Sequence, residues 1–215
     1  MKYPAKIKIT LPEPIEVLDP EEESGKKIKH ELIPLRFPTV SDHTDMYEAN
    51  ENSGRQNAWL LARLSDLPTA AFSGEAPACL VTLINQKYQD HFGNDAALQG
   101  ELLAQDYQPV KHGIPKALYY TLAIPMQVGG IRVEKVKVPR PPMKAYEEID
   151  EKNYMVGEFP GFFGKFLQYK SKNGWARLNG THIRNMFVND AWALWKILDF
   201  FTPTQEVCQV ETEFS

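Results

Sequence analysis

Residues 127–139 read Gln127-Val-Gly-Gly-Ile-Arg-Val-Glu-Lys-Val-Lys-Val-Pro139, which is the clearest β-hairpin signal in the chain. The Gly129-Gly130 pair supplies the positive φ angles that a two-residue hairpin turn requires. The preceding stretch, Tyr119–Ile124, has the composition of the partner strand. Apolar residues alternate along the second strand with one slip, so a bulge near Lys135 is needed to bury all four of them: Ile131, Val133, Val136 and Val138. We expect a bulged hairpin that ends at Pro139.

The residues after this hairpin carry helical signals. A helix over 142–149 would be entered through a proline in its first turn. A second helix is expected around Phe162, Phe163, Phe166 and Leu167. Asn189-Asp190 is typical of an N-cap for a last helix, whose apolar face is Ala191, Leu194, Trp195, Leu198 and Phe201.

The same order of signals occurs about 100 residues earlier. Lys6–Leu11 alternates strictly between polar and apolar residues, and Ile15–Leu18 continues the strand. An acidic, glycine-containing turn over 19–25 leads to a second strand, Lys27–Phe37. Thr39-Val-Ser-Asp42 fits a capping box, in which a hydroxyl accepts from a free helix amide and the acid three residues later reaches back. A helix is therefore expected from about Val40.

Two more helices should follow in the first half. Gly54 is expected to interrupt the helix from Val40, and a second helix runs to Leu67-Pro68. A third helix is expected from Ala76 to Phe92, with Gly93 as its stop. The residues predicted to face the core are Ala58, Leu61, Ala62 and Leu64 in the second helix, and Cys79, Leu80, Leu83, Ile84 and Tyr88 in the third.

These patterns predict an α+β protein of two tandem modules, each a β-hairpin followed by a small helical bundle. The expected boundaries are a first module over 1–92, a linker over 93–116 with a short helix around Ala96–Ala104, a second module over 117–201 and a tail over 202–215. The repeat rests on the order of the elements and on the two strand-proline-helix junctions, because the copies share few identical residues.

Composition indicates an ordinary globular protein: 43% of the 215 residues are hydrophobic and 24% are charged. The longest apolar runs are far below the ~20 residues that span a bilayer, so we expect a cytosolic protein. Cys79 and Cys208 have no metal-binding spacing and are expected to be free thiols.

The net charge of −4 is distributed unevenly. Residues 1–92 hold 10 basic and 14 acidic side chains, whereas residues 117–201 hold 12 basic and 8 acidic ones. Either this is a random surface difference, or the two halves present opposite potentials to each other or to different partners. Neither half is basic enough to predict nucleic-acid binding.

No catalytic motif is found, and neither a cofactor nor a metal site is predicted. The five histidines occur singly. His43-Thr-Asp45 and Asp90-His91 are sequence neighbours of the kind that usually form caps or charge pairs. We therefore expect that the protein is not an enzyme.

The second half is rich in large aromatic residues. Most of them should be core, but a module of under 100 residues can hardly bury so many rings, and these residue types are enriched at interfaces. The candidate partner-binding residues are Phe162, Phe163, Phe166, Trp175, Trp192 and Trp195.

Three segments of the first half carry a resemblance to a known family. They are Lys6-Ile-Lys-Ile-Thr-Leu-Pro-Glu-Pro-Ile-Glu-Val17, Glu31-Leu-Ile-Pro-Leu-Arg-Phe-Pro-Thr-Val-Ser-Asp42 and Ala58-Trp-Leu-Leu-Ala-Arg-Leu-Ser-Asp-Leu-Pro68. In their order and in their residues these segments resemble the short tail assembly chaperones of long-tailed bacteriophages. The resemblance covers about residues 5–92, and residues 117–201 share only the layout.

This resemblance implies a non-catalytic factor of the host cytoplasm, encoded by a phage or prophage. Its partners would be the tape measure protein and the tail tube protein, and self-association is a further expectation. It also implies that the motif residues are structural. The alternative is a structural component of a tail or tail-like particle: a tube, terminator or baseplate protein.

Overall fold

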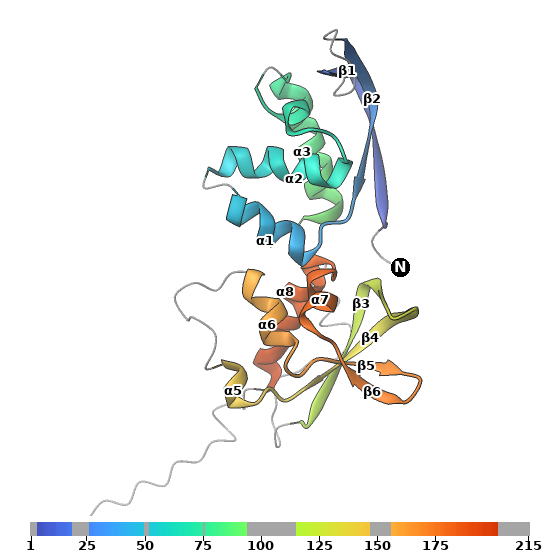
Figure 1. Ribbon diagram of the computed structural model, residues 1–215, viewed down its shortest axis with the longest axis vertical. Helices are drawn as coiled ribbons and strands as arrows, with labels where there is room; N and C mark the ends of the chain where they lie inside the picture. Colours follow the sequence, from blue (N-terminus) through green and yellow to red (C-terminus); the bar gives the residue numbers. More distant parts are fainter. Residues whose placement is uncertain are drawn as a thin grey trace, which may run out of the picture. The chain divides into compact units, whose positions relative to one another are not determined.

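The computed structural model describes residues 4–18, 26–49, 52–74, 76–93, 115–146 and 156–201 (Figure 1). The chain divides into two compact units, Met1–Asn94 (unit 1) and Asp95–Ser215 (unit 2). The protein is mixed α and β, with two sheets and several helices. The predicted acidic turn over 19–25, the helix around 96–104, Cys208 and the tail over 202–215 lie outside the described residues. In the described ranges, no helix is long and apolar enough to cross a membrane.

Unit 1 is built on a long antiparallel hairpin of β1 (Lys6–Leu18) and β2 (Lys27–Arg36). As the alternation predicts, one face of the hairpin is buried. Its buried residues are Ile9, Leu11, Ile15, Val17, Ile33 and Leu35. The hairpin predicted for the first half is therefore present, and its inner face supplies part of the unit's core.

The helices of unit 1 are α1 (Val40–Ala49), α2 (Ser53–Ser65) and α3 (Ala78–Phe92), with a 3₁₀ turn, η1 (Thr69–Phe72), between the last two. In Figure 1 they lie beside the hairpin; α2 contacts β2, α3 contacts β1, and α1 packs against α2. Helix α1 already ends at Ala49, so Gly54 lies in the first turn of α2 rather than interrupting α1.

Cys79 was predicted to face the core, but it is exposed and is a free thiol. The buried residues of α3 are Leu80, Ile84, Tyr88 and Phe92, which recur every four residues. Since successive helical residues are about 100° apart, the residue before Leu80 falls outside this stripe.

Unit 2 contains a four-stranded antiparallel sheet in the order β3-β4-β5-β6. The strands are β3 (Ala117–Val128), β4 (Ile131–Pro139), β5 (Gln168–Ser171) and β6 (Gly174–Arg177). The β3–β4 turn is as predicted, with φ of 54° at Gly129 and 77° at Gly130. Sequence patterns did not indicate the short β5–β6 hairpin, which joins the sheet through two residue pairs with β4.

The two long hairpins have the same irregularity. In unit 1 the register jumps between Thr10, opposite Leu32, and Ile15, opposite His30, so four residues of β1 face one residue of β2. In unit 2 it jumps between Thr121, opposite Lys135, and Met126, opposite Val133, again four residues against one. The bulge expected near Lys135 is thus present, with its extra residues in β3. The sequences match as well: Thr-Leu-Pro-Glu-Pro over 10–14 and Thr-Leu-Ala-Ile-Pro over 121–125.

The remaining helices of unit 2 are short, apart from the last. They are α5 (Met143–Tyr146), η2 (Val156–Glu158), α6 (Phe159–Phe163), α7 (Gly180–Arg184), α8 (Val188–Ile197) and η3 (Leu198–Phe201). The helix predicted around Phe162–Leu167 already ends at Phe163 because the chain turns into β5. The helix predicted over 142–149 is seen as α5, and residues 147–149 lie outside the described ranges.

Asn189-Asp190 does not cap α8, which begins one residue earlier, at Val188. The Asp190 side chain is fully buried and binds the β3 bulge instead. It accepts hydrogen bonds from the Tyr120 hydroxyl at 2.7 Å and from the backbone N–H groups of Ala123 at 2.8 Å and Ile124 at 3.2 Å. These amides cannot pair within the irregular ladder, so a buried acceptor stabilises the bulge.

Candidate partner-binding surfaces

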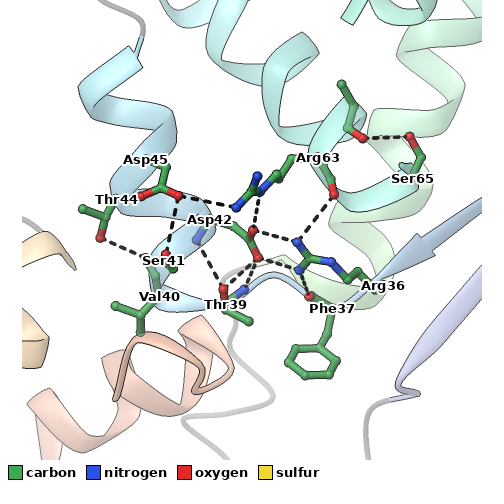
Figure 2. A network of polar contacts seen from close by, with 11 residues as sticks. Arg36, Phe37, Thr39, Val40, Ser41, Asp42, Thr44, Asp45, Arg63 and Ser65 are labelled. Carbon is green, nitrogen blue, oxygen red and sulfur yellow. Dashed lines mark hydrogen bonds and ion pairs between the residues drawn. The ribbon is translucent and has the colours of Figure 1, made fainter. Parts of the chain in front are cut away.

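The junction between β2 and α1 contains a network of polar contacts centred on Asp42, whose side chain is 3% exposed (Figure 2). Arg36, at the end of β2, donates to both carboxylate oxygens, at 2.6 and 2.7 Å. Thr39 donates to the same carboxylate through its backbone N–H at 2.9 Å and its hydroxyl at 2.8 Å. The Asp42 N–H in turn donates to the Thr39 hydroxyl oxygen at 3.2 Å, which completes the predicted capping box.

Arg63 extends the network to α2. Its guanidinium lies 3.5 Å from Asp42 and 3.7 Å from Asp45. The Arg63 group also sits over the Trp59 ring, 5.9 Å from its centroid. A strand end and two helices are therefore joined through one buried carboxylate.

Electrostatics keep this carboxylate ionised. Burial is the largest single influence and raises the pKa of Asp42, but the hydrogen bonds from Arg36 and Thr39 and the guanidinium charge together outweigh it, so the pKa lies below its ordinary value. The hydrogen bond to Asp42 in turn raises the pKa of Arg36. Because the oxygens of Asp42 are occupied and shielded from solvent, the network suits a structural role and not proton transfer to a ligand.

The two His/Asp neighbours noted in the sequence do not pair. His43 contacts the Tyr88 hydroxyl at 3.4 Å, and Asp45 faces Arg63 and Ser41. Burial lowers the pKa of His43, against the opposing charge of Asp42. In the Asp90-His91 pair, Asp90 forms a salt bridge with Lys87 at 3.4 Å and not with His91.

The structure separates the six candidate partner-binding aromatics into three groups: three buried phenylalanines, two half-buried tryptophans and the exposed Trp175. Phe162, Phe163 and Phe166 are at most 5% exposed, so they are core residues in the described structure and not an accessible surface. Trp192 and Trp195 are half-buried and pack against Phe159, with ring centroids 4.8 and 5.7 Å apart. The module thus buries more of its rings than their number suggested, because the aromatic rings of α6 and α8 pack against one another in edge-to-face and stacked contacts.

Trp175 is the exception, because it lies on β6 with 39% of its surface exposed. Its ring centroid is 5.6 Å from that of Tyr119 on β3, which is 45% exposed. Sequence reasoning missed Tyr119 because nothing in the local pattern places it beside a residue 56 positions away.

Exposed large apolar side chains are concentrated on the strands. Among the described residues they are Leu18, Ile28, Leu32, Tyr47, Tyr119 and Trp175, and all except Tyr47 lie on the two sheets. Leu18 and Ile28 flank the tip of the β1–β2 hairpin, where Val17 faces Ile28 and Leu18 faces Lys27. The hairpin tip and the β3–β6 sheet are the apolar surfaces open to a partner.

Within the described part of the chain, no group of three or more His, Cys, Asp or Glu side chains is arranged to hold a metal ion. Comparisons with protein-family models, curated proteins and solved structures give no significant match to this chain.

Proposed function

We propose that this protein is a non-catalytic phage tail assembly chaperone made of two tandem modules, which binds the tape measure protein and assists assembly of the tail tube. The observation that carries the proposal is the position of its exposed apolar side chains. Leu18, Ile28 and Leu32 lie on the unit 1 hairpin, and Tyr119 and Trp175 lie on the unit 2 sheet. Exposed apolar surface on a strand suits a protein that holds a partner chain.

Two further features support this reading. The Arg36–Asp42 segment, which carries part of the resemblance, forms a network in which Arg36 and Thr39 hold the buried Asp42 carboxylate, as expected of structural motif residues. The two hairpins share a Thr-Leu-x-x-Pro bulge of four residues against one, which favours an origin of the modules as copies of one unit. In the host cytoplasm such a protein would act before the particle is complete.

The test is co-expression of the full chain with the tape measure protein of the same genome, followed by co-purification. The chain should capture the tape measure protein. The triple variant Leu18→Ser, Ile28→Ser, Leu32→Ser should reduce capture at least tenfold. The matched control is Lys6→Ser, Lys8→Ser, Glu13→Ser, which changes three exposed polar residues of β1 and should leave capture unchanged.

Purified tails provide the second readout. A chaperone should be missing from mature particles, whereas stoichiometric presence there would overturn the proposal in favour of a tube, terminator or baseplate protein. Failure of the wild-type chain to capture the tape measure protein would also overturn it.

A further inference from the structure

The outward face of the unit 2 sheet combines aromatic and basic side chains from all four strands. Tyr119 comes from β3, Lys137 from β4, Lys170 from β5 and Trp175 from β6. The pairing explains the common face, since Tyr119 lies opposite Lys137 and Lys170 lies opposite Trp175. The opposite face is the core side, where Tyr120, Val136 and Val138 are fully buried.

The cations of this outer sheet face surround the Trp175 ring. The Nζ atoms of Lys137 and Lys170 lie 5.4 and 5.8 Å from the ring centroid. Arg177, two residues along β6 from Trp175, and Lys135, two residues along β4 from Lys137, are exposed and project to the same side. The indole ring thus has two ammonium groups within 6 Å of its centroid, as in a cation–π contact.

Carboxylates of the described residues do not neutralise these cations. Among those residues, none of Lys135, Lys137, Lys170 and Arg177 is in a salt bridge. The nearest acid along β4, Glu134, is bound to Arg132 at 2.8 Å. An anionic group placed beside Trp175 would find two lysines without carboxylate partners and gain charge-assisted hydrogen bonds from them.

We propose that the outer sheet face binds an acidic polypeptide segment, with Tyr119 and Trp175 as the apolar centre of the contact and Lys137, Lys170 and Arg177 as its charged rim. The inference rests on the proposed function for the identity of the partner, an acidic segment of the client. An aromatic centre with a polar rim is the usual anatomy of a protein-binding patch.

Charge balance favours a polypeptide over a nucleic acid. A nucleic acid presents a continuous run of phosphates, and tight binding uses many neutralising contacts. This face offers four cations, Lys135, Lys137, Lys170 and Arg177, which is few for a continuous run of phosphates. A segment with a few spaced carboxylates matches that number.

The test uses the full chain and a fluorescein-labelled peptide of repeated Glu-Leu-Glu-Ala units, with binding measured by fluorescence anisotropy. The variant Lys137→Glu, Lys170→Glu, Arg177→Glu should weaken binding at least tenfold. The matched control, Lys144→Glu, Arg184→Glu, Lys196→Glu, makes the same change in net charge at exposed helix positions of unit 2 and should stay within twofold of wild type. Trp175→Ala should weaken binding and Trp175→Phe should largely retain it.

Added salt should weaken the peptide complex. Absence of binding, or equal loss in the two charge-reversed variants, would overturn the inference. Tighter binding of single-stranded oligothymidylate with the same dependence on Lys137, Lys170 and Arg177 would overturn it in favour of a nucleic acid. Capture of the tape measure protein distinguishes the two proposals. Capture without peptide binding would refute only the acidic-peptide site, and peptide binding without capture would refute only the chaperone function.

Discussion

Replacing Asp42 with asparagine should strongly destabilise unit 1. An amide keeps one acceptor oxygen, which can still serve Thr39 and the Nη1 of Arg36 at the Oδ2 position. It turns an NH₂ group, however, toward the Nη2 of Arg36 and the Nε of Arg63 at the Oδ1 position. Removing one partner of a buried ion pair costs about 3–5 kcal/mol. Because the Arg36 side chain is 29% exposed and can regain water, we expect a loss just below this range, about 2–3 kcal/mol.

The matched control for this change is Asp45→Asn. Asp45 is also an acid of α1 that faces Arg63, but its side chain is 34% exposed and the contact is 3.7 Å long, so the loss should be below about 0.5 kcal/mol. Hydrogen exchange at increasing urea, followed peptide by peptide in the full chain, measures unit 1 separately from unit 2. With a urea dependence of about 1–3 kcal/mol per M, the Asp42 variant should open at about 1 M lower urea. Equal losses for the two variants would refute the argument that the buried carboxylate holds the junction.

Three other outcomes follow from the structure. Burial lowers the pKa of His43, so the unfolded chain binds a proton at this residue more readily than the folded chain does. The stability of unit 1 should therefore fall as the pH drops below about 6.5. His43→Gln should flatten this pH dependence in urea titrations between about pH 7 and 5. Asp190→Asn should lower the free energy of unfolding of unit 2 by about 2–4 kcal/mol. Tyr120→Phe, which removes the hydroxyl hydrogen bond to that carboxylate, should lower it by about 1 kcal/mol. Tryptophan fluorescence in urea measures both, and equal effects would contradict the role of Asp190 in holding the β3 bulge. Gly130→Ala should lower the free energy of unfolding by about 1–2 kcal/mol because the φ of Gly130 is 77°. Gly161→Ala in α6, where the added methyl group has equally open space, should be neutral or slightly stabilising. A similar loss of stability for both variants in thermal melts would exclude backbone conformation as the cause.

Local signals predicted much of each hairpin and the start of α1. The strand alternation of Lys6–Leu11 and the Thr39-to-Asp42 spacing act over two to three residues, so they can be interpreted without knowing the rest of the fold. The turn at Gly129-Gly130 is equally local, since it depends on φ angles that few other residues adopt.

Predictions from the sequence were wrong where the same local pattern is compatible with more than one structural role. Asn189-Asp190 has the sequence of a cap, but Asp190 serves the β3 bulge because buried amides without ladder partners require an acceptor there. In unit 1 the equivalent bulge contains Pro12 and Pro14, which have no N–H to satisfy, and its exposed Glu13 needs no buried partner. Cys79 shows the same limit, because its position on α3 depends on which stripe of the helix meets the hairpin.

Signals within about one helical turn were enough to predict the strands of both long hairpins, the β3–β4 turn, and the capping box that begins α1. The tertiary structure, in contrast, buries Phe162, Phe163 and Phe166 and leaves Trp175 exposed. It alone placed Asp190 against Tyr120, 70 residues away, and brought Tyr119, Lys137 and Lys170 around Trp175. Such contacts depend on the curvature and register of a four-stranded sheet, and no short sequence pattern encodes them.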